Sequence, residues 1–516
     1  MFAVKRFIQL SAAAAAALMM VSCATEVKKP TFADEGNMIP DNAVMAMKVN
    51  AQQLFDKVAG DPDSVMYDYV QEYKKNLPVD AGSLGINLDV PVVVSCSAYI
   101  QDVMRGHVSF EAYAVALLND SSALVKTIDD LAGMLKLMGF NLVKEAVDAN
   151  TYYFASFEEG MYVDLAVSPK AVVIRYTYNE DLAAASLKES MFKSFENGGP
   201  QQTDGLNEFY LTKSDIAMWM DAESMLDVVM PLIKTYEPTA AAQLQSYIPM
   251  YKGSSVVTEL NFEDGKTLLC FKIFGSEQLK LYATKYNAVP TDRFLKNIPV
   301  TAVAAGNIAY KDFSGLVDEL CTMSDEYAYA FEYLSEQFGV NEELLAGMPG
   351  TITFAVDGTE IDSREVPGFM LCAECESNVW EFVEQYIAPE SELIEEDVYY
   401  VEEGGFFVFY DNGSINVCDS NMLQVAPFGN GFSFADTALG EKIENGGFVF
   451  NLAALPKHVL NNIAQEIDYY MTGEELLEYV SSVTVNPAQD FMSATFTVNM
   501  NDRNHNLLEK LAELVL

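Results

Sequence analysis

Residues 37–50 read NMIPDNAVMAMKVN, and residues 296–309 read KNIPVTAVAAGNIA. Four positions agree in place, so that Ile39, Pro40, Ala43 and Val44 correspond to Ile298, Pro299, Ala302 and Val303. Each copy continues as a mostly apolar strand and then as a helix candidate, AQQLFDKVAG or YKDFSGLVDEL. Proline suits the start of a strand, where no ladder N–H is needed. The stretch therefore predicts the entry strand of a module that occurs twice.

The same order of features follows each copy. Two β-rich runs lead to an amphipathic helix, then to three closely spaced strands with hairpin signals between them. The phrases FENGG (195–199) and IENGG (443–447) come next, and each half closes with a strand, a helical region, a strand pair and a helix. Any α+β chain offers some such order, but the two recurring phrases in matching places favour a duplication. We expect an α+β fold of two tandem, internally duplicated modules, 37–290 and 297–516, each a mixed or antiparallel sheet with helices packed on one face.

The first helix of this series is predicted in NDSSALVKTIDDLAGMLKLMGF. Leu124, Ile128 and Leu131 recur at helical spacing, and Ser121 or Ser122 is a plausible N-cap.

The N-terminus carries the pattern of an export signal. MFAVKR is basic and FIQLSAAAAAALMMV is apolar, which is typical of a signal peptide over residues 1–22. The run ends in Met20-Val21-Ser22-Cys23, which predicts that Cys23 is lipidated and becomes the first residue of the mature chain. The alternative is an ordinary signal peptide cut after Ala24. Residues 23–36 are polar and predict a tether between lipid and first module, so the chain is expected to be anchored to a membrane and not to span it.

The net charge of the chain limits the classes of molecule that it is expected to bind. The chain of 516 residues has 75 acidic and 31 basic residues, a formal charge of −44. Such a surface repels phosphate backbones, so no nucleic-acid partner is expected. Half of the residues are hydrophobic, which is enough for large packed cores.

These features together resemble an uncharacterised lipoprotein family of Bacteroidetes-type bacteria, which is known only as a domain of unknown function. The resemblance rests on the lipobox with Cys23, the short tether and the Ile39-Pro40 with Ala43-Val44 strand that opens a long acidic α+β chain. It implies a location in the cell envelope, and it carries over no catalytic residues.

Cysteine and histidine patterns give little support for redox or metal chemistry. Cys372-Ala373-Glu374-Cys375 is a C-x-x-C motif, but a zinc site needs two more ligands. A redox pair needs an exposed thiol of low pKa, as at a helix N-terminus. Buried structural cysteines are the favoured interpretation. The motif has no second copy, and the remaining candidates are dispersed: His107, His458 and His505, with Cys96, Cys270, Cys321 and Cys418.

Other candidate patterns are equally weak. Signatures of nucleophilic catalysis and of phosphate binding are absent from the sequence. Acidic doublets in so acidic a chain are expected on solvated surfaces; they are Glu158-Glu159, Glu395-Glu396 and Glu402-Glu403. Asp61-Pro62-Asp63 and Asp411-Asn412-Gly413 lack the calcium-loop pattern, and the second predicts a hairpin turn. Aromatic doublets would place one ring in the core and one outside, where it could bind sugar; they are Tyr152-Tyr153, Tyr399-Tyr400, Phe406-Phe407 and Tyr469-Tyr470.

The sequence thus favours a non-enzymatic envelope lipoprotein that binds or scaffolds an envelope glycan or protein. It would be lipid-anchored at the outer membrane, the cell surface or the periplasmic face. No catalytic, metal or cofactor residues are assigned, and no cofactor is expected. The alternative is an envelope hydrolase that acts on glycan through paired carboxylates.

Overall fold

The computed structural model has two compact units. The first runs to Phe262 and includes Ile273–Gly275 and a stretch from Leu508, and the second comprises Glu263–Lys272 and Ser276–Leu507. The predicted modules rest on repeated sequence features and not on contacts, so their boundaries stay a prediction. The structure describes residues 38–60, 84–102, 107–137, 142–147, 149–158, 161–178, 184–195, 203–245, 248–323, 325–348, 350–358, 368–402, 404–419, 433–467 and 479–510, with 62, 67, 68, 199 and 200.

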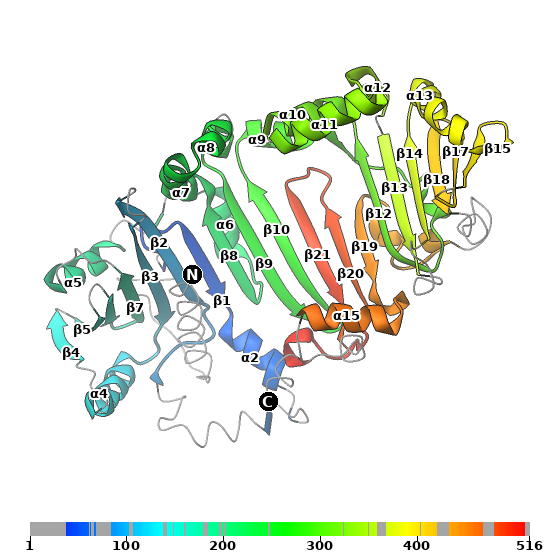
Figure 1. Cartoon of the computed structure of the whole chain (residues 1–516). Helices are drawn as coiled ribbons and strands as arrows, with labels where there is room; N and C mark the ends of the chain where they lie inside the picture. Colours follow the sequence, from blue (N-terminus) through cyan, green and yellow to red (C-terminus); the bar gives the residue numbers. More distant parts are fainter. Residues whose placement is uncertain are drawn as a thin grey trace. The chain divides into compact units, whose positions relative to one another are not determined.

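The first unit is built on an antiparallel sheet (Figure 1). Its strands pair in the order β9-β8-β1-β2-β3-β7-β6-β5-β4. The entry strand β1 therefore lies inside the sheet, between a strand that follows it and a strand from far along the chain. The strands are β1 (Met45–Val49), β2 (Val92–Asp102), β3 (His107–Leu117), β4 (Val143–Val147), β5 (Asn150–Glu158), β6 (Met161–Val167), β7 (Ala171–Tyr178), β8 (Ile216–Asp221) and β9 (Ser255–Glu263).

Helices cover both faces of this sheet, which corrects the expectation of helices on one face. Tyr152 packs in one core with Met191 of α5, whereas the next residue, Tyr153, packs with Leu124 of α4 on the opposite face. Both tyrosines are buried, because neither face is left to solvent at this point. The helical segments are α2 (Ala51–Ala59), α4 (Ser121–Leu137), α5 (Ala184–Lys193), α6 (Asp204–Leu211), α7 (Ala222–Tyr236), α8 (Pro238–Leu244) and η3 (Ile248–Tyr251).

The predicted helix at α4 is confirmed, but its cap differs. Asp120 Oδ1 accepts hydrogen bonds from the backbone N–H groups of Ser122 and Ala123 at 2.9 and 3.1 Å. The aspartate thus satisfies two N–H groups that have no partner within the helix, and neither predicted serine caps the helix.

The strands of the second unit are antiparallel as well, and this set of strands is called the second sheet. Its strands pair in the order β10-β21-β20-β19-β12-β13-β14-β18-β17-β16-β15, and the short β11 also pairs with β12. The second entry strand, β12, again lies inside its sheet. The strands are β10 (Lys266–Phe274), β11 (Asn287–Ala288), β12 (Ala302–Tyr310), β13 (Gly350–Asp357), β14 (Phe369–Glu374), β15 (Glu392–Glu395), β16 (Val398–Val401), β17 (Phe406–Tyr410), β18 (Ser414–Asp419), β19 (Gly447–Asn451), β20 (Ser482–Pro487) and β21 (Ser493–Asn499).

Both faces of the second sheet are also packed, over part of their area. Phe407 of β17 packs with Phe434 and Ile443 of two 3-10 turns, whereas the neighbouring Val408 packs with Trp380 of α13 on the other face. The helical segments are α9 (Glu277–Tyr286), η4 (Leu295–Asn297), α10 (Phe313–Met323), α11 (Asp325–Phe338), α12 (Glu342–Ala346), α13 (Ser377–Ile387), η5 (Ala388–Glu390), η6 (Phe434–Asp436), η7 (Glu441–Ile443), η8 (Leu452–Ala454) and α15 (Lys457–Ile467).

The two entry stretches form the same turn. The backbone N–H of Ala43 donates to the carbonyl of Pro40, and that of Ala302 donates to the carbonyl of Pro299, each at 3.0 Å. The isoleucine before each proline, Ile39 or Ile298, is fully buried in the core of its unit. The isoleucine, proline and alanine that the two stretches share thus have the same structural roles in both units.

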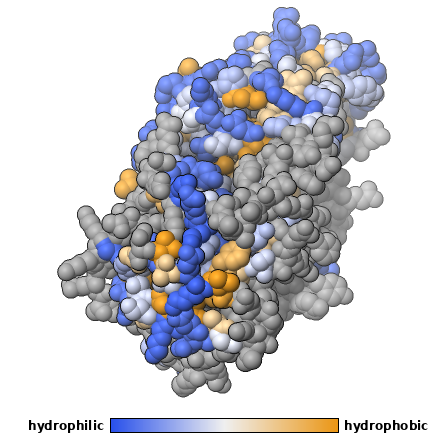
Figure 2. All heavy atoms as spheres, turned by 90° about the vertical axis from the view of Figure 1, so that its left-hand side faces the viewer, coloured by the Kyte–Doolittle hydropathy of each residue, from blue (hydrophilic) through white to orange (hydrophobic). Residues whose placement is uncertain are grey.

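The edge strand β4 carries charged side chains that form ion pairs. Lys144 of β4 lies 2.5 Å from Asp129, and Glu145 lies 2.6 Å from Lys188. Figure 2 looks at the side where β4 and α5 lie in Figure 1, and hydrophilic residues form a band there with hydrophobic patches beside it. Charged side chains on an edge strand discourage pairing with another chain.

Among the described residues, no helix has both the length and the apolar character that a membrane crossing needs.

Candidate functional site

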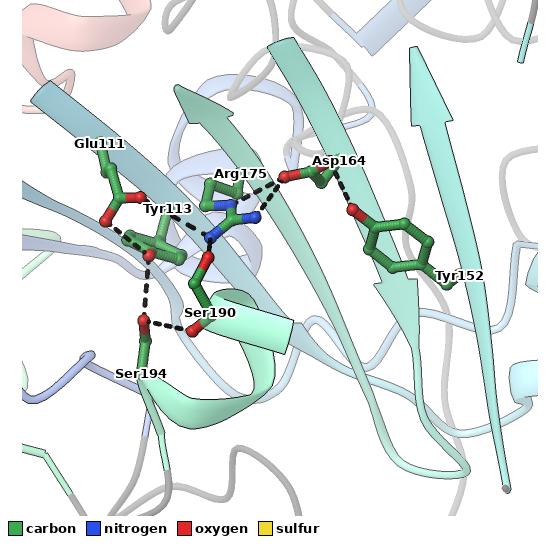
Figure 3. Close-up of polar contacts among 7 residues, drawn as sticks. All are labelled: Glu111, Tyr113, Tyr152, Asp164, Arg175, Ser190 and Ser194. Atoms are coloured by element: carbon green, nitrogen blue, oxygen red, sulfur yellow. Dashed lines mark hydrogen bonds and ion pairs between the residues drawn. The ribbon is translucent and has the colours of Figure 1, made fainter. Parts of the chain in front are cut away.

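A buried group of charged and polar residues lies on one face of the first sheet (Figure 3). At its centre Arg175 of β7 stands directly opposite Asp164 of β6 and, on the other side, Tyr113 of β3. The Nε and Nη2 atoms of Arg175 donate to Asp164 Oδ2 at 2.8 and 2.6 Å. Both side chains have an exposed fraction of 0%, so this ion pair is removed from water.

Glu111 is the second carboxylate of the group. Its Oε1 lies 3.6 Å from Arg175 Nη1, and its Oε2 accepts a hydrogen bond from the Tyr113 hydroxyl at 3.0 Å. Helix α5 and the residue just after it complete the arrangement. Ser190 Oγ in the helix accepts from Arg175 Nη1 at 2.9 Å, and Ser194 Oγ beyond its end lies 3.2 Å from the Tyr113 hydroxyl. One positive and two negative groups thus share a buried region, which leaves a formal charge of −1.

The titration of the buried groups follows from these contacts. Burial raises the pKa of Tyr113 to about 12, with help from the nearby Glu111 carboxylate. Burial also raises the pKa of Tyr152, whose hydroxyl donates to Asp164 Oδ1 at 2.6 Å. For Arg175, burial is the largest single influence and acts to lower the pKa, but the interactions with Asp164, Tyr113 and Glu111 together outweigh it, and the pKa lies above its usual value. Both tyrosines are therefore neutral hydrogen-bond donors near neutral pH, and the arginine is charged.

Four hydroxyl groups on the same face have no hydrogen-bond partner among the described residues. Ser97 and Thr177 stand directly opposite Glu111 on its two neighbouring strands, and Ser95 stands opposite Tyr113. Ser109 precedes Glu111 by two positions on β3, so its side chain points to the same face. All four side chains are buried. An unpaired buried hydroxyl is costly, so the surroundings of Glu111 are polar beyond the needs of packing.

The corresponding row of the second unit is apolar. In the first unit the row runs through directly opposed residues: Ala46, Ser95, Tyr113, Arg175, Asp164 and Phe154. In the second unit the row that starts at Ala305, the position aligned with Ala46 in the predicted repeat, contains Ala355, Met370, Cys418, Phe407 and Tyr400. The second unit thus forms the same strand order without an ion pair in this row.

A second feature is an incompletely covered apolar face of the second sheet. One row of directly opposed residues crosses seven strands there: Leu371, Phe354, Gly306, Phe448, Val485, Phe496 and Leu269. The next row holds Phe369, Val356, Ala304, Phe450, Val483 and Val498. The exposed fractions of Phe450, Leu371 and Phe496 are 50%, 38% and 36%. Seven strands at about 4.8 Å spacing span roughly 29 Å, so this is an extended apolar surface.

Aromatic contacts organise this surface. Phe354 and Phe448 flank Gly306 with ring centroids 5.9 Å apart. A Cβ on Gly306 would lie 2.5 Å from Phe354 and 2.8 Å from Phe448, so the two rings fill the space above the glycine. Phe271 and Phe496 form a further pair at 5.6 Å.

The predicted lipidation residue, Cys23, lies outside the described residues, as do the signal segment and the tether. Tyr469-Tyr470, Asp61, Asp63, Glu159 and Glu403 lie outside them too.

The C-x-x-C pair is not poised for thiol chemistry. Cys372 of β14 and Cys375 just beyond it are both buried. Burial raises the pKa of Cys372 to about 12 and also raises that of Cys375. Cys418 lies on the strand beside Cys372, and its pKa is likewise raised to about 12 by burial. All three are protonated near neutral pH, and the six cysteines after Cys23 are free thiols.

The other predicted residues stay apart from the buried group. Glu395 and Glu396 are exposed, and Glu402 is exposed as well. The predicted hairpin turn is confirmed, because Asn412 and Gly413 both have positive φ and the Asp411 and Ser414 backbones exchange two hydrogen bonds. His505 lies 2.5 Å from Asp502 on the surface.

Sequence reasoning missed the buried group, although one signal was available. Arg175 sits within the apolar run AVVIRYTY, and Asp164 sits within MYVDLAV, the strand before it. A charged residue inside each of two consecutive apolar strands indicates a buried ion pair across them, since consecutive strands joined by a tight turn are neighbours.

Comparison with known proteins adds little to this geometry. No protein-family model matches the chain, and no curated protein does. A solved structure of another protein, "Structure of crystal form I of TP0453", is similar over 48% of this chain and 80% of its own, with 10% sequence identity and a TM-score of 0.25. At that level the likeness carries no argument about this chain.

Proposed function

We propose that this chain is a lipid-anchored envelope protein with a binding or scaffolding role, built from two copies of one α+β module. The observation that carries the binding role is the extended apolar face of the second sheet. Exposed contiguous apolar surface on a folded protein is typical of interaction sites. The expected partner therefore presents apolar groups, as a protein or as the apolar face of a glycan.

The duplication is supported by strand order. The order β9-β8-β1-β2-β3-β7-β6-β5-β4 matches β20-β19-β12-β13-β14-β18-β17-β16-β15 strand for strand, when the strands are counted from each entry strand. The identical Pro–Ala turns before β1 and β12 begin the correspondence in both units. A shared topology with nine strands in the same order is rarely reached twice by chance.

A binding role is also favoured over hydrolysis by how the buried ionisable groups are engaged. Arg175 donates to Asp164 and Ser190, and Tyr113 donates to Glu111. Side chains that hydrogen-bond to one another in this way hold neighbouring strands together, whereas a general acid or base must reach a substrate. A glycan hydrolase activity of the purified chain that Glu111→Gln abolishes would contradict this proposal.

The apolar face can be tested with a fluorescent hydrophobic probe. We expect the native protein to enhance the fluorescence of anilinonaphthalene sulfonate, and the double variant Phe450→Ser, Phe496→Ser to reduce that enhancement several-fold, because both rings are removed from one surface. Leu281→Ser is the matched control, since Leu281 is an exposed apolar residue on α9. Equal loss in the control and the double variant would count against a dedicated surface.

The anchor can be tested by fractionation. We expect the native chain to partition with membranes and Cys23→Ala to appear in the soluble fraction, because the acyl chains would supply the membrane affinity. Cys96→Ala, at a half-buried thiol in β2, serves as the control and should stay with the membranes. Metabolic labelling with palmitate would report the modification directly, and a labelled Cys23→Ala chain would refute the assignment.

A further inference from the structure

The region around Glu111 has the composition of a small-ion site. Ser97 on β2 and Thr177 on β7 stand directly opposite Glu111 on both sides. Directly opposed residues of antiparallel strands hold their Cβ atoms about 4.5–5.5 Å apart on one face. Neither hydroxyl bonds to the carboxylate, and among the described residues Ser109 and Ser95 have no hydrogen-bond partner either. Five oxygen-bearing side chains thus occupy nearby positions on one face of the sheet, and no hydrogen bond joins them.

The charge of this region is not balanced by the side chains that the structure describes. Arg175 donates two hydrogen bonds to Asp164, and the two residues together form a neutral ion pair. The Glu111 carboxylate is left with one hydrogen bond from Tyr113 and a looser contact of 3.6 Å with Arg175. A buried net charge is strongly unfavourable unless a partner compensates it.

The size of the occupant is limited by burial. The oxygen atoms of the four hydroxyls are inaccessible to solvent. The Glu111 side chain, however, retains an exposed fraction of 10%, so any occupant of this region would have to be of atomic size.

We propose that Glu111, with Ser97, Thr177 and the adjacent hydroxyls, binds a monovalent cation such as Na⁺ or K⁺. Hydroxyl and carboxylate oxygens are hard ligands that suit cations of this class. Water would satisfy the hydroxyls but would leave the charge of −1 in place. Divalent cations use several carboxylates, and of the two described here Asp164 is already paired with Arg175.

The test measures the midpoint of thermal unfolding of the full-length protein in chloride salts of equal ionic strength. We expect NaCl or KCl to raise the midpoint by about 2–4 °C over choline chloride, since a ligand that binds only the folded state stabilises it. Glu111→Gln should abolish this difference, because the amide oxygen still accepts from Tyr113 but carries no charge. Glu145→Gln, an exposed glutamate in the same unit, should retain it.

Ser97→Ala gives a second readout that does not depend on Glu111. If Ser97 is a ligand, the variant unfolds at a lower midpoint temperature than the native chain, and its midpoint no longer depends on sodium or potassium. If Ser97 is merely an unpaired hydroxyl, its removal raises the midpoint in every salt, and the proposal fails. An unchanged midpoint between choline and both alkali salts, or a midpoint raised by CaCl₂ alone, would also overturn it.

Discussion

Replacing Arg175 by methionine is expected to lower the free energy of unfolding by about 3–5 kcal/mol. The arginine is fully buried, and its loss leaves the Asp164 and Glu111 carboxylates in the core without the positive charge of the Arg175 side chain. Urea unfolding of the full-length chain, with the slope checked for constancy, measures the change.

Two control variants separate the buried pair from arginine in general. Arg293 forms a partly exposed ion pair with Glu374 at 3.5 Å, so Arg293→Met should cost roughly 1 kcal/mol or less. The double variant Asp164→Leu, Arg175→Met should recover part of the loss, since it gives the row the apolar character found in the second unit. A single Arg175→Met variant as stable as the native chain would show that the carboxylates are not held by this arginine.

The second large effect is expected at Gly447, the last residue of IENGG. Its φ is +126°, and an added Cβ would lie 2.1 Å from the carbonyl oxygen of Val485. Gly447→Ala would combine a backbone conformation that side chains rarely adopt with a clash against a neighbouring strand. We expect a loss on the order of 3 kcal/mol in the free energy of unfolding.

Gly405 supplies the matched control, because its φ of +66° is also positive but a Cβ there meets nothing within 4 Å. Gly405→Ala should therefore cost only about 1 kcal/mol, the conformational part alone. If both variants lose the same stability, then β20 yields to the added methyl group and the packing argument at Gly447 is wrong.

Local features were predictable from the sequence because local chemistry decides them. The strands at AVVIRYTY and MYVDLAV follow from β-branched and aromatic runs between turn residues. The Asn412-Gly413 turn follows from the φ > 0 that its geometry requires. The mixed α+β class follows from the same patterns.

Features that depend on pairing across long sequence distances were not predictable. Helices on both faces went unrecognised because alternation along a strand does not report what covers each side. Strand β15, ELIE, was missed because all of its residues are exposed and it has no apolar alternation. The approach of Glu111 to Thr177 depends on β3 pairing with β7, and no spacing in the sequence specifies that register.

The position of β1 has a consequence for how the first unit folds. Met45 pairs with Cys96 on one side and with Met220 on the other. Until residues 216–221 leave the ribosome or a translocation channel, one side of β1 has no strand to pair with. Non-local pairing of this kind slows folding and leaves a strand edge open to other chains meanwhile. Each half of this protein therefore completes its sheet late, when its returning strand arrives, and a chain cut short between the two events would expose an interior edge that the finished protein never shows.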